Sequence, residues 1–328
     1  SNPFSAKPGG FITGAGHGST IADRYGNWWH ASTMRISVNY DFERRVGLFP
    51  AGFDKDGVLY CNQNFSDYPH RIPAGKFDAT SQQPEWMLLS YKKPVTASST
   101  AENSSPELAV NEDCRSWWSA AGAEPGEWLC VDLSKENDVR AIQVNMADEK
   151  LVVDFPADSY GDARKPRHIE TRPQISHYTV ETSVNGADWT TRETVARECS
   201  NGYYEYADSI RARYVRVTGG ELPYGQPLRI SGLRVFGNGE GAKPAQAEAA
   251  GARVDALDAK ITWKHIENAQ GCNVRYGAAP DKLYLSWLVY DTDEVTLSTL
   301  TAGQEYYVCV DSFNENGITP GKIFKLEG

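Results

Sequence analysis

The sequence predicts an all-β protein. Apolar and polar residues alternate with a period of two from end to end, and clusters of Gly, Pro, Asn and Asp separate the alternating stretches. No long segment carries the 3.6-residue period of an amphipathic helix, so no helical interpretation competes with this one. The chain has 328 residues, which is enough for two or three domains.

Two breaks in composition divide the chain. Residues 74–84 are polar and do not alternate, and residues 237–251 are rich first in Gly and then in Ala, as is typical of a linker. We therefore expect three β-domains, at residues 1–80, 85–238 and 245–328.

Net charge and hydropathy argue against several functions. The chain carries 43 Asp and Glu against 33 Lys and Arg, which gives a net charge of −10 and a sequence pI of about 5.2. Nucleic acids and anionic lipid surfaces attract proteins with excess positive charge, so neither partner is expected. No apolar run is long enough to insert into a membrane. The first residues lack the pattern of a signal peptide, so we expect that one was removed or that the chain begins inside a larger protein.

The cysteines form no Cys-x-x-Cys pair, which argues against zinc sites and redox motifs. The six are scattered along the chain: Cys61, Cys114, Cys130, Cys199, Cys272 and Cys309. Several lie in alternating apolar stretches, so small buried thiols are expected. Cys272 and Cys309 could instead pair within the last domain.

The first segment is predicted to form two β-hairpins. Short apolar stretches flank a polar turn at residues 23–27, and others flank the turn at residues 54–57, which ends in the Asp-Gly pair typical of hairpins. The four strands would make one sheet with two apolar faces, and a lone sheet cannot bury both. We expect one face to dock on the middle domain through residues 148–175, and the other to meet another polypeptide.

The same segment carries a set of short motifs. They are Gly14-Ala15-Gly16-His17-Gly18-Ser19, Asp23, Gly26, Trp28-Trp29-His30, and residues 34–39 and 47–54. This set resembles the last blade of the five-bladed propeller of glycoside hydrolase family 43. The resemblance implies inverting hydrolysis by two carboxylates about 6.5–9.5 Å apart, both on earlier blades. No carboxylate of this segment matches a catalytic position of the family, so we expect no catalytic residue in this chain.

His17 is the one residue of this segment with an implied functional role. The resemblance places it near the propeller axis, often close to a bound divalent cation. We expect His17 to support the active site and to be a metal contact, with calcium as the cation; no cofactor is required otherwise. The alternative is a histidine that only holds its loop. His30 follows two tryptophans in a strand and is expected to be structural.

The middle segment has landmarks over its whole length. They are residues 96–99, 116–119, 127–133, 178–183, 212–217 and 233–237, with Asn185-Gly186 and Trp189. This segment resembles a coagulation factor five/eight type C (discoidin) domain, the jelly-roll sandwich also found in family 32 carbohydrate-binding modules. Such domains bind glycans, lipids or proteins, or serve as scaffolds. Trp118, Trp128 and Trp189 coincide with core positions of the family.

Many relatives of this kind bind calcium, and we expect no metal at the corresponding place here. Asn111-Glu112 and Gly232 stand where the relatives have an Asp-Gly pair and a glutamate. Asp113 alone cannot supply the six to eight oxygens that calcium prefers.

Residues 148–175 form a long polar connection, which is uncommon without a function or a packing role. A sugar site combines an aromatic face with fixed polar groups, so our candidates for carbohydrate binding are His168, Arg172 and Tyr224. The alternative is that this connection packs on a neighbouring propeller.

The last segment, residues 245–328, resembles a fibronectin type III domain. Ile261-Thr262-Trp263 gives the early-strand tryptophan, and the spacing from Leu300 to Tyr306 is that of a tyrosine corner. No adhesive Arg-Gly-Asp motif is present, so we expect a spacer.

Together these features predict the C-terminal accessory region of a polysaccharide-degrading glycoside hydrolase that is extracellular, on the cell surface or periplasmic. The resemblance implies an inverting parent of xylosidase or arabinofuranosidase type that acts on plant-type polysaccharide or oligosaccharide. The upstream blades would be a separate or cleaved polypeptide. Two alternatives stay open: a non-catalytic carbohydrate-binding or adhesion protein, and pure scaffolding.

Overall fold

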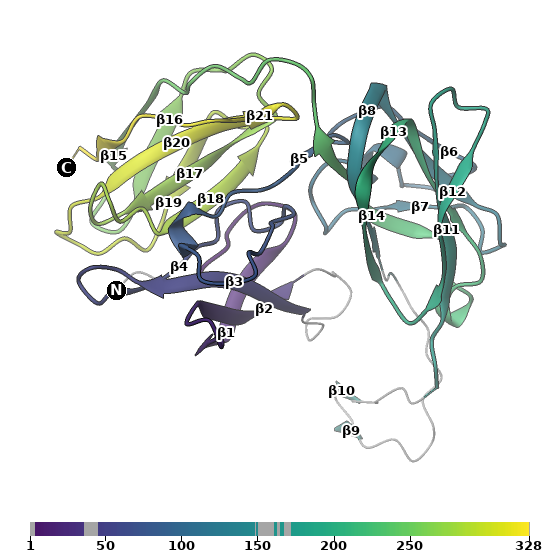
Figure 1. Ribbon diagram of the computed structural model, residues 1–328, viewed down its shortest axis with the longest axis horizontal. Helices are drawn as coiled ribbons and strands as arrows, with labels where there is room; N and C mark the ends of the chain where they lie inside the picture. The colour runs from purple at the N-terminus through teal and green to yellow at the C-terminus, as the bar shows by residue number, and fades with distance from the viewer. Residues whose placement is uncertain are drawn as a thin grey trace. The chain divides into compact units, whose positions relative to one another are not determined.

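Strands make up nearly all of the regular structure, so the all-β prediction is confirmed (Figure 1). The computed structural model describes residues 4–35, 45–147, 149, 161–162, 165–166 and 172–327. This part contains 22 strands, three 3-10 helices of at most four residues and no α-helix. None of its helices is long and apolar enough to cross a membrane.

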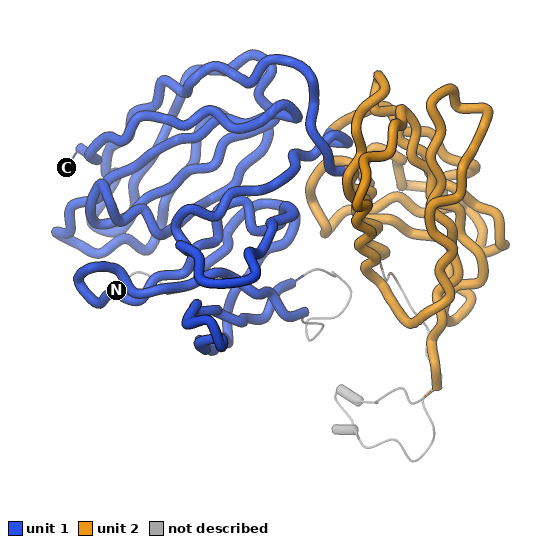
Figure 2. The backbone as a smooth tube through the Cα atoms, viewed as in Figure 1, with its two compact units in different colours: residues 1–36, 42–91, 236–328 blue, residues 37–41, 92–235 orange. Residues whose placement is uncertain are grey.

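The chain divides into two compact units, coloured separately in Figure 2. The first unit joins the described residues up to Tyr91 with those from Phe236 onwards, and the second holds Lys92–Val235. The first and last of the three expected segments therefore share one unit.

The first segment forms a four-stranded antiparallel sheet in the order β1-β2-β3-β4. Its strands are β1 (Thr13–Ala22), β2 (Trp28–Arg35), β3 (Arg45–Phe53) and β4 (Leu59–Cys61). Both predicted hairpins are present. In the first turn, the Asp23 carboxylate accepts hydrogen bonds from the backbone N–H groups of Tyr25 and Asn27. Asp54 repeats this arrangement with Asp56 and Val58, and a glycine at positive φ completes each turn.

One face of this sheet is covered and the other is open. Because side chains alternate along a strand, His30, Ser32 and Met34 of β2 all point to the covered face, where they are buried. His30 Nδ1 lies 2.9 Å from the Thr20 hydroxyl oxygen. This contact agrees with the structural role expected for His30. The open face includes Trp29 and its cross-strand neighbours; the most exposed apolar side chains on it are Val46 (79%), Ile21 (66%) and Leu48 (59%).

The last segment is a sandwich of two antiparallel sheets. The smaller sheet contains β15 (Ala249–Arg253), β16 (Ala259–Trp263) and β19 (Glu294–Leu297). The larger contains β17 (Gly271–Gly277), β18 (Leu285–Tyr290), β20 (Tyr307–Asn314), β21 (Gly317–Thr319) and β22 (Phe324–Lys325). Ile261 and Val310, from opposite sheets, belong to one buried core. The Tyr306 hydroxyl accepts a hydrogen bond from the backbone N–H of Thr301 at 3.1 Å, so the predicted tyrosine corner is present.

The six cysteines are all free thiols, and five of them are buried. Cys272 lies opposite Ser312 and Cys309 lies opposite Arg275 on neighbouring strands, so the disulfide that the sequence left open between them does not form. Burial raises the pKa of both thiols to about 12, which keeps them protonated and unreactive at neutral pH.

The first sheet packs on the C-terminal sandwich within the first unit. Tyr60 of β4 stacks on Tyr284 with ring centroids 4.7 Å apart. The Asp54 carboxylate accepts a hydrogen bond from the Tyr284 hydroxyl at 2.8 Å and lies 2.8 Å from the Lys282 ammonium. The hydrogen bond from Lys282 lowers the pKa of Asp54. The segment that was expected to be a spacer therefore packs against β4 and the turn before it, while Phe4 and Ile12 pack on the buried cluster of the covered face. The docking expected through residues 148–175 falls largely outside the described residues.

The second unit is built on two long antiparallel strands. β8 (Trp128–Met146) and β13 (Asn201–Gly219) pair along most of their length, with register shifts that bend the ladder. Around them lie β6 (Val95–Ala97), β7 (Trp118–Ser119), β11 (Ser176–Ser183), β12 (Thr190–Arg197) and β14 (Arg229–Asn238). The last residues of β14, from Phe236 on, belong to the first unit, where Phe236 and Gly237 pair with β5 (Met87–Leu88). In the second unit, β9 (Gly161–Asp162) also pairs with β10 (Lys165–Pro166).

The three tryptophans expected in the core of this unit differ in burial. Trp118 is fully buried, as predicted. Trp128 is only half-buried because it is the first residue of β8, at the end of the ladder. Trp189 is also half-buried; it precedes β12, and the Arg216 guanidinium lies 3.9 Å from its ring centroid. The core prediction is therefore wrong for Trp128 and Trp189. Both side chains are partly exposed to solvent, and Trp189 also contacts the charged side chain of Arg216.

A buried ion pair occupies the place where calcium was considered. Both carboxylate oxygens of Glu112 accept hydrogen bonds from the Arg234 guanidinium, at 2.8 and 2.9 Å, and both side chains are buried. Asp113 pairs with Arg115 on the surface. The carboxylates of Glu112 and Asp113 are therefore both paired with arginines.

Candidate functional site

His17 lies in β1 and is exposed, in a left-handed backbone conformation (φ 49°) where the pairing of β1 with β2 is irregular. Such strain is common at functional sites. Within the described ranges, no three His, Cys, Asp or Glu side chains lie close enough together to hold a metal ion. The described residues therefore supply no set of ligands that could hold a cation together with His17. Its expected support of the active site and its expected contact with calcium stay predictions.

The other candidate residues belong to the second unit. Arg172 is exposed just before β11. Tyr224 lies in the one-turn 3-10 helix Pro223–Gly225, is 37% exposed and has φ of 58°. His168 lies outside the described residues. The carbohydrate-binding role proposed for these three residues stays a prediction.

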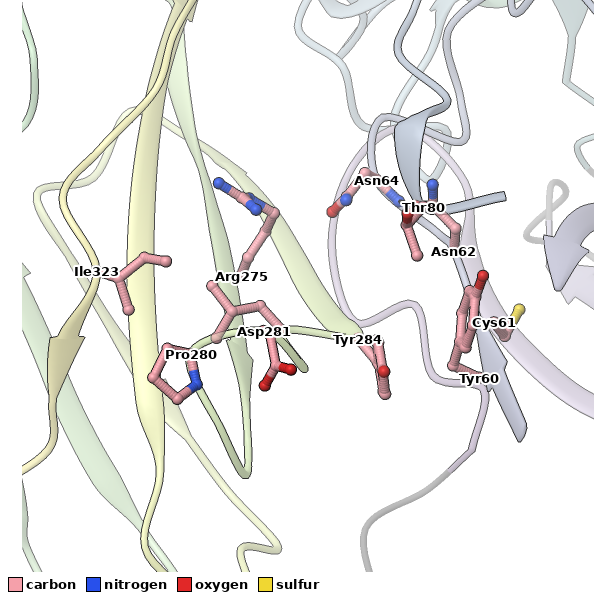
Figure 3. Close-up of a pocket in the computed structure, with 11 residues that line it drawn as sticks. Tyr60, Cys61, Asn62, Asn64, Thr80, Arg275, Pro280, Asp281, Tyr284 and Ile323 are labelled. Atoms are coloured by element: carbon pink, nitrogen blue, oxygen red, sulfur yellow. Dashed lines mark hydrogen bonds between the residues drawn. The ribbon is translucent and has the colours of Figure 1, made fainter. Parts of the chain in front are cut away.

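Two hollows in the first unit are candidates for a site that the sequence did not predict. One, of about 150 Å³, lies between the first segment and the C-terminal sandwich, where Tyr60, Asn62 and Thr80 face Arg275 and Asp281 (Figure 3). Its polar groups are already paired within the protein. Arg275 binds Asp311 at 2.5 and 2.9 Å, and Asp281 binds Lys55 at 2.8 Å. We interpret this hollow as part of a packing interface.

The other hollow, of about 160 Å³, is named here the Trp29 pocket. Strands β2 and β3 supply Trp29, Leu48, Phe49 and Pro50, and the connection after β4 supplies the other lining residues, including all the polar ones. It is lined by Trp29, Leu48, Phe49, Pro50, Asn62, Asn64, Ser66, Tyr68, His70, Ile72 and Gln82. None of these eleven residues carries a carboxyl group or a permanent positive charge.

The indole of Trp29 is held in a fixed orientation. Its Nε1–H donates to the Asp23 carboxylate at 3.0 Å, and its ring meets the Phe77 ring edge-on at a centroid distance of 5.4 Å. The hydrogen bond from Trp29, with those from Asn27 and Tyr25, lowers the pKa of Asp23 to about 2, so this acceptor is charged at neutral pH. The result is a rigid aromatic wall.

Two residues that line this pocket each have one buried polar atom without a hydrogen-bond partner among the described residues: Ser66 Oγ and His70 Nδ1. The other ring nitrogen of His70, Nε2, lies 2.9 Å from the carbonyl oxygen of Phe65. Burial lowers the pKa of His70 below its usual value, so the ring is neutral at pH 7. Buried polar groups without partners are rare in folded proteins.

Local sequence patterns did not predict this pocket. Trp29 follows another tryptophan in an apolar strand and was assigned to the sheet, while Ser66 and His70 lie in a loop without a motif. Only the pairing of Trp29 with Pro50 across β2 and β3, and the return of the loop over this face, bring the residues together.

Comparison with known proteins places no family on the chain. No model of a known protein family matches it, and no curated protein sequence matches it. Solved structures that resemble it include carbohydrate-binding modules. One is chitosan-binding module 1 from a chitosanase/glucanase of Paenibacillus sp. IK-5, with 19% identity over 46% of this chain and 99% of that chain, and a TM-score of 0.36.

A fucose binding module of Streptococcus pneumoniae has 21% identity over 49% of this chain and 99% of that chain, with a TM-score of 0.34. A structure described as a glycoside hydrolase has 18% identity over 69% of this chain and 47% of that chain, with a TM-score of 0.35. Likeness at this level assigns neither a ligand nor an activity to this chain, so the function is argued from the geometry.

Proposed function

We propose that this chain is a carbohydrate-binding region of a polysaccharide-degrading glycoside hydrolase, and that the Trp29 pocket binds a neutral sugar. The observation that carries the proposal is the composition of this pocket: a fixed indole beside imidazole, hydroxyl and amide groups, with no carboxylate. Sugars present an apolar face of C–H groups ringed by hydroxyls, so an aromatic wall with a few convergent polar groups suits them. Such a protein acts outside the cell or in the periplasm, where polysaccharides are found.

The catalytic carboxylates would belong to another polypeptide seated on the open face of the first sheet. Two exposed apolar side chains of that face outside the Trp29 pocket, Ile21 and Val46, support this part of the proposal, because a β-sheet partner would bury them. The carboxylates of Asp23 and Asp54 are already engaged in turns and with Trp29 and Lys282. The parent would be an inverting xylosidase or arabinofuranosidase that acts on plant-type polysaccharide.

Residues 1–328 alone are expected to hydrolyse no aryl-pentoside. Inverting hydrolysis needs an acid and a base on opposite sides of the glycosidic bond, and the pocket holds neither. The measurement is release of nitrophenol from aryl-xyloside and aryl-arabinofuranoside by repurified protein. Turnover that is lost when Asp23 or Asp54 is replaced by Asn would contradict the prediction.

Trp29→Ala is expected to weaken binding to neutral plant glycans by about tenfold or more, since truncating a central aromatic anchor removes its stacking contact. Binding is measured on a glycan array and then by calorimetry, with circular dichroism to confirm the fold. Tyr25→Ala is the matched control, because Tyr25 is an exposed aromatic on the neighbouring turn that does not line the pocket. Affinity that survives Trp29→Ala but is lost in Tyr224→Ala would move the site to the second unit.

A further inference from the structure

We propose that the first unit holds a second carbohydrate site, in which the Lys243 ammonium binds the carboxylate of an acidic sugar. The site is a hollow of about 530 Å³, named here the Lys243 hollow. It lies where residues 83–87 and 238–243 meet the larger sheet of the C-terminal sandwich. The inference goes beyond the proposed function, because Trp29 does not line this hollow and the expected ligand is charged.

Lys243 supplies a positive charge that no carboxylate of the hollow balances. One of the two carboxylates that line it, Asp311, binds Arg275 at 2.5 and 2.9 Å. The other, Glu85, lies 2.6 Å from the Arg71 guanidinium. No described residue forms an ion pair with Lys243. An anionic group of a ligand can therefore pair with this ammonium without displacing a side chain of the protein.

The segment that carries Lys243 is held against the sandwich by hydrogen bonds on both sides of this residue. Before it, the Ala242 carbonyl accepts from the side-chain amide of Asn316 at 2.9 Å. After it, the Pro244 carbonyl accepts from the Thr319 hydroxyl at 2.7 Å. The backbone of Lys243 is thus ordered before any ligand binds, which lowers the entropic cost of binding.

The stem of the lysine side chain lies against Gly317, which also lines the hollow. A Cβ atom added to Gly317 would come within 2.7 Å of Lys243 Cε. Gly317 also has φ of 133°, a conformation that residues with a side chain rarely adopt. Glycine at this position leaves room for the lysine stem along the wall of the hollow. Lys243 itself is exposed, so a ligand can reach it.

The other lining groups favour a sugar acid over an inorganic anion. The side-chain amides of Gln83 and Asn238 are exposed and take part in no hydrogen bond among the described residues, so they are available to sugar hydroxyls. Ile318 and Pro320 add apolar surface for the C–H groups of a sugar ring. The volume falls within the roughly 300–1,000 Å³ of small-molecule sites, far more than an inorganic ion fills. The expected ligand is a uronate, a sugar with a carboxylate and several hydroxyls.

The test titrates the full chain with trigalacturonate and with the methyl ester of the same trisaccharide, by calorimetry. The ester keeps the rings and hydroxyls but has no charge. At low salt the acid is expected to bind roughly 3- to 10-fold more tightly than the ester, as one charge-assisted contact does. This preference should shrink as sodium chloride is added, since salt screens exposed charges.

Three variants locate the contact. Lys243→Gln keeps most of the side-chain length and is expected to reduce the affinity for the acid to that for the ester. Lys322→Gln is the matched control, because it removes the same charge from an exposed lysine of the sandwich that does not line the hollow. It should change neither affinity. Gln83→Ala removes an uncharged contact, so it should weaken the acid and the ester by the same factor. Circular dichroism confirms the fold of each variant.

Several results would overturn the inference: no binding of trigalacturonate to the wild-type chain, equal affinity for acid and ester, or wild-type affinity in Lys243→Gln. An equal loss in Lys243→Gln and Lys322→Gln would also do so, because only net charge would then matter. If inorganic phosphate displaces trigalacturonate at equal concentration, and sodium chloride of the same ionic strength does not, the site binds anions without recognising a sugar. Trp29→Ala should leave trigalacturonate binding unchanged, so the proposed function and this inference fail separately.

Discussion

Phe313→Ala is expected to destabilise the first unit by about 3–5 kcal/mol, as the truncation of a buried phenylalanine typically does. Phe313 lies in β20 of the C-terminal sandwich and is fully buried. Three aromatic rings meet it edge-on: Phe65 and Tyr68 from the first segment, at centroid distances of 5.1 and 6.3 Å, and Tyr290 at 5.5 Å. Its loss leaves a cavity where the two segments join.

The specific expectation is that the first segment detaches before the sandwich unfolds. Urea denaturation gives the loss of stability, and limited proteolysis followed by mass measurement shows whether cleavage begins within residues 4–91. Tyr306→Phe is the control, because it removes the tyrosine-corner hydrogen bond of the same sandwich without touching the first segment. Equal protease sensitivity of the first segment in both variants would show that Phe313 does not join the two parts.

Features set by a few neighbouring residues could be predicted from the sequence. The turns at Asp23 and Asp54 form because each carboxylate caps N–H groups two and four residues later, and a glycine supplies the positive φ. The tyrosine corner likewise depends on one spacing of five residues, from Thr301 to Tyr306. Alternation fixes which side chains of β2 share a face, so the buried face of that strand follows from the pattern.

Features that depend on distant contacts could not be predicted. The first segment packs on the sandwich through Tyr284, Lys282 and Phe313, more than 200 residues further along the chain, and no local pattern marks these residues as partners of Tyr60, Asp54 and Phe65. For the same reason, Trp118, Trp128 and Trp189 were all expected in the core, and Trp29 was expected only as part of the sheet. Only the structure shows that Trp29 has a face in a pocket and that Trp189 lies beneath Arg216.

The candidate site likewise combines a feature set by neighbouring residues with a feature set by distant contacts. Its aromatic wall lies on a predicted strand, but its hydroxyl and imidazole come from a loop whose position is set by Lys7 and Phe313. A sequence motif for such a site would need residues from three separated stretches. The residues selected from the sequence belong instead to the other unit, because a long polar connection was the strongest local signal there.

Arg234→Met is expected to destabilise the second unit by about 3–5 kcal/mol, because it leaves Glu112 buried and charged without its partner. The guanidinium donates to both carboxylate oxygens of Glu112, at 2.8 and 2.9 Å, and to Gln143 Oε1 at 2.8 Å. The pair itself need not be a net source of stability, since bringing two charges out of water is costly. The loss should therefore come from the orphaned carboxylate.

A double variant distinguishes a stability loss caused by the orphaned carboxylate from one caused by lost packing. Glu112→Leu combined with Arg234→Met removes both charges at similar volume and is expected to recover most of the stability lost in Arg234→Met, as measured by urea denaturation. Calcium titration of the wild-type chain should leave the unfolding midpoint of the second unit unchanged, because the Glu112 oxygens are already bound by the guanidinium. If the double variant is as unstable as Arg234→Met, the guanidinium acts through its packing. A midpoint that rises with calcium would instead mean that a metal ion competes with Arg234 for Glu112.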